Sequence, residues 1–170
     1  LVSLVMNFTK PTDTKPSLLT FNEVTTFLHE FGHALHGMFS KCTYGSTSMD
    51  GVSRDFVELP SQFMENYALE KEWLDTWAVH YQTGEKIPQE YIDKIKKSSN
   101  FQAGYASDRQ LSFGMVDMAW HTITEPVTEP LADFEQRAMG KTEIMPLVKG
   151  SAFSPAFGHI FAGGYAAGYY

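Results

Sequence analysis

Apolar and polar residues alternate along this chain mostly at helical spacing. The clearest such segment spans residues 21–40, where apolar side chains recur every three or four positions. Thr20 and Glu23 form the S/T-x-x-E pattern that begins a helix, so we expect the helix to start directly after Thr20. Gly32 and Gly37 lie inside this segment, and a glycine within a helix indicates that another backbone approaches closely there.

Further segments also follow the helical pattern, and prolines and glycines delimit them. Pro60 lies within the first of these segments, so that helix either begins near the proline or is kinked by it. Gly84 ends the second segment and Gly140 ends the last. The predicted helical segments are residues 53–69, 70–81, 87–97, 99–121 and 131–139.

The start of the chain has a different pattern. Residues 1–8 are rich in β-branched and apolar side chains, which predicts a short β-strand, and the two prolines within residues 9–17 predict a loop. One strand does not make a sheet, so its partner would have to come from outside these residues. We therefore expect a mainly α fold with a short N-terminal β-strand.

Composition and charge narrow the class of protein. The chain has 170 residues, of which 43% are hydrophobic and 14% aromatic, enough for about one globular domain with a core. The net charge of −7 argues against nucleic acid and anionic membranes as partners. The apolar run at residues 1–6 is too short to cross a bilayer. Because the chain does not begin with Met, we expect it to be part of a longer protein.

The motif His-Glu-x-x-His at positions 29–33 is the main candidate for chemistry. His29 and His33 are four residues apart, so a helix places both imidazoles on one face, where they can bind one metal ion. Glu30 lies about 100° around the helix from His29, beside the metal position. Two histidines with a neighbouring glutamate that can accept a proton from water are typical of zinc hydrolases.

A catalytic zinc also needs a third protein ligand and an open position. His36 lies about 10 Å further along the helix axis than His29, too far to share a metal with it on a straight helix. The pattern with a third histidine, HExxHxxGxxH, is not present. Residue type and spacing alone leave five carboxylates open as the third ligand: Asp50, Asp55, Glu58, Glu65 and Glu70.

Two stretches, residues 29–36 and 51–62, resemble the signature of the thimet oligopeptidase family of zinc peptidases. That signature reads HExGHxxH followed by D-x-x-E-x-P-S, with a glutamate ligand 25 residues after the second histidine. Glu58 lies 25 residues after His33. The resemblance implies that His29, His33 and Glu58 bind one Zn²⁺ per chain and that Glu30 is the general base. It also implies that residues 1–170 form one zincin-like, helical catalytic region of a larger single-chain peptidase.

The end of the chain is similar to the Gly-Gly-Tyr segment of the same family. The resemblance implies that His159 and Tyr165 contact the substrate and the developing oxyanion, and a phenol O–H is suited to donate to such an oxyanion. Gly163 and Gly164 would allow this segment to move over the substrate. Tyr169 is a weaker candidate for substrate contact.

The resemblance is closest to the peptidyl-dipeptidases, also called dipeptidyl carboxypeptidases. It implies zinc-dependent hydrolysis of oligopeptides with release of C-terminal dipeptides. One alternative is an endo-acting oligopeptidase of the same family. The other is a non-catalytic helical module that binds zinc and peptide, which is how we expect the isolated fragment to behave. We expect an oligopeptide as the partner, a monomeric full-length protein, and a cytoplasmic location, with the periplasm as the alternative.

Overall fold

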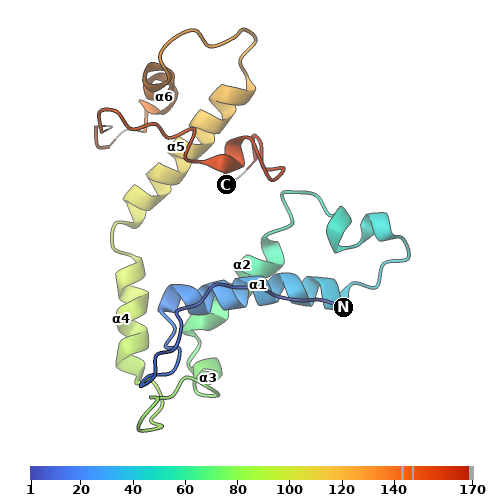
Figure 1. Ribbon diagram of the computed structural model, residues 1–170, viewed down its shortest axis with the longest axis vertical. Helices are drawn as coiled ribbons and strands as arrows, with labels where there is room; N and C mark the ends of the chain where they lie inside the picture. Colours follow the sequence, from blue (N-terminus) through green and yellow to red (C-terminus); the bar gives the residue numbers. More distant parts are fainter. Residues whose placement is uncertain (143, 147, 169–170) are drawn as a thin grey trace. The chain divides into compact units, whose positions relative to one another are not determined.

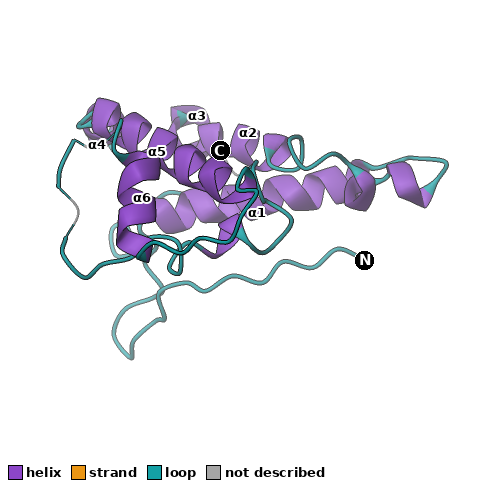
Figure 2. Ribbon diagram, turned by 90° about the horizontal axis from the view of Figure 1, so that it is seen from above, coloured by secondary structure: helices purple, strands orange, loops and turns teal. Residues whose placement is uncertain are grey.

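The computed structural model describes residues 1–142, 144–146 and 148–168, and it is mainly helical, as predicted. Figure 2 shows helices joined by loops. The chain divides into two compact units, Leu1–Ser99 and Asn100–Tyr170. None of the helices in the described ranges is both long and apolar enough to cross a membrane.

The first unit is built around α1 (Phe21–Phe39), which packs against α2 (Leu59–Glu65) (Figure 1). Val24, Leu28 and Ala68 form its buried apolar cluster. The remaining helices of this unit are short 3₁₀ turns and two further α-helices: η1 (Gly45–Thr47), η2 (Met49–Gly51), η3 (Asn66–Leu69), α3 (Lys71–Leu74) and α4 (Gln89–Ser99).

Gly32 makes the close packing of α1 on α2 possible. A Cβ atom at this position would lie 2.5 Å from the carbonyl oxygen of Pro60 and 2.6 Å from Cα of Ser61. The predicted approach of another backbone is therefore confirmed at Gly32. At Gly37 it is wrong, because the neighbours there are the side chains of Met49 and Val2.

The predicted capping box begins α1. Thr20 Oγ1 accepts a hydrogen bond from the backbone N–H of Glu23 (3.2 Å), and Glu23 Oε2 accepts one from the backbone N–H of Thr20 (2.7 Å). The other carboxylate oxygen of Glu23 accepts from both the backbone N–H (2.6 Å) and the hydroxyl (2.8 Å) of Thr9. Glu23 thus ties the preceding loop to the first turn of α1. These hydrogen bonds, that from the Thr20 backbone first, lower the pKa of Glu23 from 4.5 to about 2.

This network predicts an acid-dependent contribution of Glu23 to stability. Because the folded state lowers the pKa of Glu23, the contribution is fully present above about pH 5 and is lost as the pH falls to about 2. We expect Glu23→Gln to lower the melting temperature near neutral pH and to have little effect near pH 2. Thermal unfolding of both proteins across this pH range, with the exposed Glu72→Gln as control, checks the expectation. A difference between wild type and Glu23→Gln that does not change with pH would contradict it.

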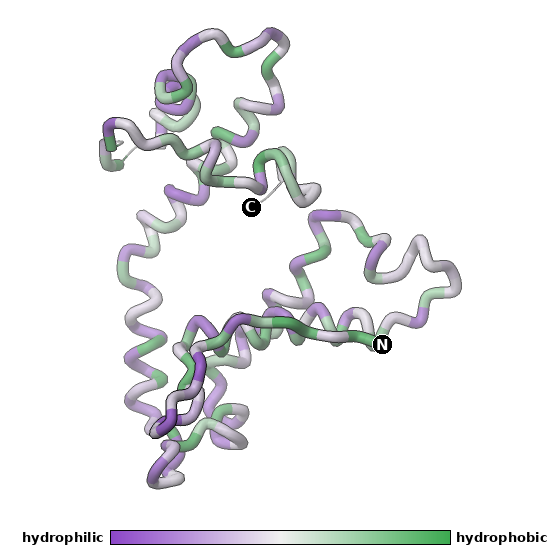
Figure 3. The backbone as a smooth tube through the Cα atoms, in the orientation of Figure 1, coloured by the Kyte–Doolittle hydropathy of each residue, from purple (hydrophilic) through white to green (hydrophobic). Residues whose placement is uncertain are grey.

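The structure does not show the predicted N-terminal β-strand. Residues 1–8 are extended but pair with no strand in the described part of the chain. They run along α1 (Figures 1 and 2), and the tube is hydrophobic near its start (Figure 3). The side chain of Val2 lies beside Gly37 of α1. A helix uses its backbone N–H and C=O groups internally, so it gives the segment an apolar surface but no hydrogen-bonding ladder.

Two of the predicted helices are shorter in the structure. Residues 54–58 form turns, and α2 starts at Leu59 because Pro60 suits the first turn of a helix. In residues 70–81, only Lys71–Leu74 is α-helical. The chain then reverses at Gly84 (φ 72°), and Val79 forms an isolated β-bridge with Lys86. The later helices, α4, α5 (Ala103–His121) and α6 (Leu131–Met139), agree with the predicted segments to within a few residues.

The second unit packs α5 (Ala103–His121) against α6 (Leu131–Met139), followed by η4 (Gly158–Ile160). Val116, Met139 and Ile160 form its buried cluster. Two carboxylates are also buried here, each 1% exposed: Asp117 and Glu135. Glu135 accepts hydrogen bonds from the backbone N–H groups of Phe153 (2.9 Å) and Ser154 (2.6 Å), which fastens the chain after α6 to the helix.

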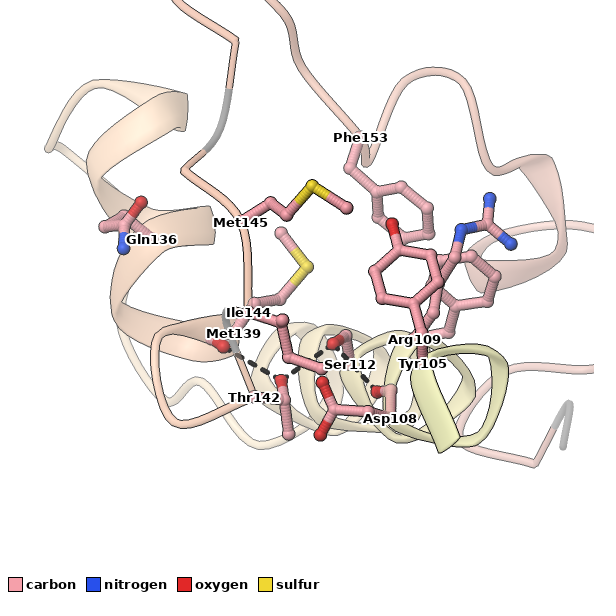
Figure 4. A pocket seen from close by; sticks show the side chains of 11 residues that line it. Tyr105, Asp108, Arg109, Ser112, Gln136, Met139, Thr142, Ile144, Met145 and Phe153 are labelled. Carbon is pink, nitrogen blue, oxygen red and sulfur yellow. Dashed lines mark hydrogen bonds between the residues drawn. The ribbon is translucent and has the colours of Figure 1, made fainter. Parts of the chain in front are cut away.

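A cavity of about 200 Å³ lies beside α5 and α6 in this unit (Figure 4). Its walls are mostly apolar and include Tyr105, Met139 and Phe153. At its floor, the hydroxyl groups of Ser112 and Thr142 are hydrogen-bonded to each other, with 2.7 Å between Ser112 Oγ and Thr142 Oγ1. The cavity lacks the grouped histidines and carboxylates that the first unit contains.

Candidate metal centre

The packing of two helices in the first unit brings together three side chains that could bind a metal ion. His29 and His33 project from one face of α1, as their spacing predicts, and their rings lie 5.0 Å apart at an angle of 85°. Glu58 is the residue immediately before α2. In the described ranges, these three residues form the one group of His, Cys, Asp or Glu side chains that could hold a metal ion.

The donor atoms converge closely. Glu58 Oε2 lies 3.2 Å from His29 Nε2 and 3.1 Å from His33 Nε2, and one donor atom from each residue lies within 4.8 Å of the others. The three side chains are between 27% and 29% exposed, so the site is partly shielded and still open to solvent. Such a site can admit both an ion and a reactant.

The donor set fits Zn²⁺. Zinc is bound by imidazole nitrogen and carboxylate oxygen at about 2.0–2.2 Å, and tetrahedral ligands at that distance stand roughly 3.3 Å apart. The two nitrogen–oxygen distances at Glu58 are close to this value. Two histidines and one carboxylate leave a fourth tetrahedral position free, which is the arrangement of catalytic rather than structural zinc sites.

The position of Glu58 depends on the contact between α1 and α2. The Ser61 side chain is fully buried, and its hydroxyl lies 2.9 Å from both Glu58 Oε2 and the Glu58 carbonyl oxygen. Ser61 and Pro60 are also the residues against which Gly32 packs. The turn that presents Glu58 is therefore placed by the backbone contact at Gly32, one residue before His33.

Glu30, the predicted general base, follows His29 on α1 and is half-buried. It does not belong to the group of three donor residues. A carboxylate next to a metal site but outside its ligand set is suited to accept a proton from water.

The other candidate ligands and His36 have different positions. Asp50, Asp55 and Glu70 do not belong to the donor group. The His36 ring packs at 6.0 Å from that of Phe56, and its Nδ1 atom is buried without a hydrogen-bond partner among the described residues.

Glu65 is a site residue whose contact the sequence did not predict. Its Oε1 atom lies 2.7 Å from His29 Nδ1, on the side of the ring away from Glu58. Glu65 is one of the five carboxylates that residue type and spacing leave open as a metal ligand. Its spacing of two helical turns from Glu58 could have indicated that both side chains lie near the same site. The structure places it against the Nδ1 side of the His29 ring and outside the donor group.

The predicted substrate-contacting residues belong to the second unit. The rings of His159 and Tyr165 lie 5.2 Å apart, so the structure brings these two side chains together. Gly163 and Gly164 both have positive φ angles, 77° and 76°, which non-glycine residues rarely adopt. Tyr169, the weaker candidate, lies outside the described residues.

Asp117 binds the backbone of the chain just after Tyr165, a contact that no pattern in the sequence predicted. Asp117 Oδ1 accepts a hydrogen bond from the backbone N–H of Ala167 (2.9 Å) and lies 2.9 Å from His121 Nδ1. The i, i+4 spacing of Asp117 and His121 on α5 could have indicated their pairing. It gave no indication of Ala167, which is 50 residues away in the chain.

Comparison with known proteins assigns the chain to a family. Organellar oligopeptidase A of Arabidopsis thaliana is 46% identical over 98% of this chain, oligopeptidase A of Escherichia coli is 44% identical, and dipeptidyl carboxypeptidase of Salmonella typhimurium is 42% identical, each again over 98% of the chain. The chain spans only about a quarter of the length of these relatives, from 21% to 25%. Residues 1–170 match the family described as Peptidase family M3. This chain therefore belongs to peptidase family M3.

Proposed function

We propose that this protein is a zinc-dependent peptidase that hydrolyses oligopeptides, with His29, His33 and Glu58 as the ligands of one Zn²⁺. The observation that supports it most is the convergence of three donor atoms within 4.8 Å. Glu30, which follows His29 in the sequence, is a carboxylate outside this donor group. The names of the relatives, oligopeptidase A and dipeptidyl carboxypeptidase, are consistent with oligopeptides as substrates.

Glu30 is the proton carrier in this proposal. A bound zinc supplies a Lewis acid that polarises the scissile carbonyl and acidifies water. Glu30 accepts the proton from the attacking water and later donates it to the leaving amine, which is general base followed by general acid catalysis. A partly exposed site suits this role, because the carboxylate must be reachable by water and by the peptide.

His159 and Tyr165 are proposed to donate hydrogen bonds to the oxyanion that develops on the scissile carbonyl. The contact between their two rings supports a shared role. Gly163 and Gly164 have positive φ angles that non-glycine residues rarely adopt, and we propose that this segment adjusts around a substrate. Tyr169 is retained as a further candidate for substrate contact.

The mode of cleavage that we propose is release of C-terminal dipeptides. The alternative is endo-acting cleavage, and the relatives include both dipeptidyl carboxypeptidase and oligopeptidase A at similar identity. A second alternative, a module that binds zinc and peptide without turnover, remains a proposal for this chain in isolation. We also propose a monomeric, cytoplasmic protein; one relative is named probable cytosolic oligopeptidase A.

Metal removal and end-blocked peptides test this function together. We expect chelation to abolish peptide cleavage by the complete natural protein and one equivalent of Zn²⁺ to restore it, since three side chains here form a single site. We expect a peptide with a free C-terminus to lose dipeptides and its C-terminally amidated form to resist. Equal cleavage of both peptides at internal bonds would favour the endo-acting alternative. Zinc binding without any cleavage would favour the binding module, and cleavage that persists without metal would overturn the proposal.

A further inference from the structure

His29 has a contact that distinguishes it from His33. Both of its ring nitrogens face carboxylates, since Nε2 lies 3.2 Å from Glu58 Oε2 and Nδ1 lies 2.7 Å from Glu65 Oε1. His33 is paired with Glu58 alone among the described ion pairs. The ring of His29 is therefore held from both sides, by residues from the two ends of α2.

We propose that Glu65 is a positioning residue for the metal centre, which acts by fixing the tautomer and the orientation of His29. The inference rests on the proposed zinc site and adds a residue to it. A carboxylate oxygen 2.7 Å from Nδ1 accepts the imidazole proton there. The lone pair of the neutral ring then lies on Nε2 and points toward Glu58 and His33, as a metal ligand requires.

Glu65 acts through His29 and is not itself a ligand. Its carboxylate contacts the nitrogen on the far side of the ring from Glu58, and it lies outside the group of donor residues. With the proton on Nδ1, the lone pairs of His29 Nε2 and Glu58 Oε2 face each other at 3.2 Å. A cation between these two atoms relieves their repulsion, so the hydrogen bond to Glu65 favours metal binding.

The location of Glu65 makes this contact a consequence of the packing of α1 on α2. Glu58 precedes α2 and Glu65 is its last residue, two helical turns later, so both carboxylates lie on the same side of the helix. The Glu65 side chain is 39% exposed, compared with 27% for His29. Glu65 thus lies at the edge of the site, where a substitution changes the hydrogen bond without opening a cavity in the buried cluster.

Zinc affinity tests the inference in the complete natural protein. Loss of a carboxylate behind a ligating histidine typically weakens metal binding by about 10–100-fold, so we expect that loss for Glu65→Ala. In Glu65→Gln the amide oxygen still accepts from Nδ1–H, so a smaller loss of under about 10-fold is expected. Glu72→Gln changes an exposed carboxylate of the same unit and should not alter the affinity.

A second measurement separates positioning from a purely structural role. In protein with isotope-labelled histidine, NMR should detect the proton on Nδ1 of His29, protected from exchange by the Glu65 carboxylate. The signal should persist in Glu65→Gln and exchange faster in Glu65→Ala, while the melting temperatures of metal-free proteins stay close together. Equal zinc affinity in Glu65→Ala and wild type, or a proton on Nε2 instead of Nδ1, would overturn the inference.

The two proposals fail in different ways. If the wild-type protein binds no zinc, the proposed metal site itself is wrong. If the wild type binds one zinc and Glu58→Ala abolishes it while Glu65→Ala has no effect, the metal site stands and the role of Glu65 is rejected.

Discussion

Replacing Glu30 by glutamine is expected to lower kcat for peptide hydrolysis by about 10²–10⁴-fold, the usual contribution of a general acid–base residue. Glutamine has nearly the shape of glutamate but cannot accept a proton from water at neutral pH. Glu30 is not in the donor group of the metal centre, so zinc should remain bound at one equivalent. KM should change much less than kcat, because the residue acts in the chemical step and not in substrate binding.

The measurement is steady-state cleavage of an oligopeptide by the complete natural protein, with zinc content determined on the same samples. Glu72→Gln is the control for removing a negative charge from the first unit. If Glu30→Gln retained zinc and wild-type kcat, Glu30 could not be the base. If Glu30→Gln lost zinc, Glu30 would contribute to zinc binding although it lies outside the donor group.

Removing the Glu58 carboxylate is expected to weaken zinc binding by about 100-fold or more. This loss should exceed that from removing Glu65, which contacts a proposed ligand but is not one itself. The two histidines remain on one face of α1, but the oxygen that lies 3.2 and 3.1 Å from their nitrogens is gone. Glu58→Ala should still fold, because the side chain is 29% exposed and the packing of Gly32 on Pro60 and Ser61 does not involve it. Peptide cleavage should be lost together with zinc.

Zinc titration of Glu58→Ala, compared with Glu70→Ala, checks this expectation. Glu70 is an exposed carboxylate of the same stretch of chain and lies outside the donor group, so its removal should leave the affinity unchanged. Unchanged zinc binding in Glu58→Ala would reject Glu58 as a ligand. An equal loss in both variants would point to a general effect of charge on metal binding.

Local signals predicted the helix that contains the motif. The Thr20–Glu23 capping box and the apolar periodicity after it depend on residues a few positions apart, and α1 begins where they indicate. The spacing of His29 and His33 likewise placed both rings on one face. These features follow from the geometry of one helix, so no knowledge of the rest of the fold was needed.

The observed elements differ from the predicted ones where the outcome depends on what lies next to a segment. Residues 1–8 have the composition of a strand, but α1 is their neighbour and provides no backbone partner. Residues 70–81 have a helical pattern, but the reversal at Gly84 and the bridge between Val79 and Lys86 end the helix early. Propensity is a weak preference, and packing between distant segments overrides it.

Local patterns in the sequence were enough to predict the helical class, the start of α1 and the placing of His29 and His33 on one face of that helix, because these features follow from periodicity within single helices. Residue type and spacing left five carboxylates open as the third donor, and only the resemblance to a known family favoured Glu58. The structure brings Glu58 beside the two histidines through the contact of Gly32 with Pro60 and Ser61. That contact fixes how α2 lies on α1. As a result, Glu58 lies beside Nε2 of the His29 ring and Glu65 lies beside Nδ1. Residues 25 and more positions apart meet only through such packing, and no local pattern specifies it.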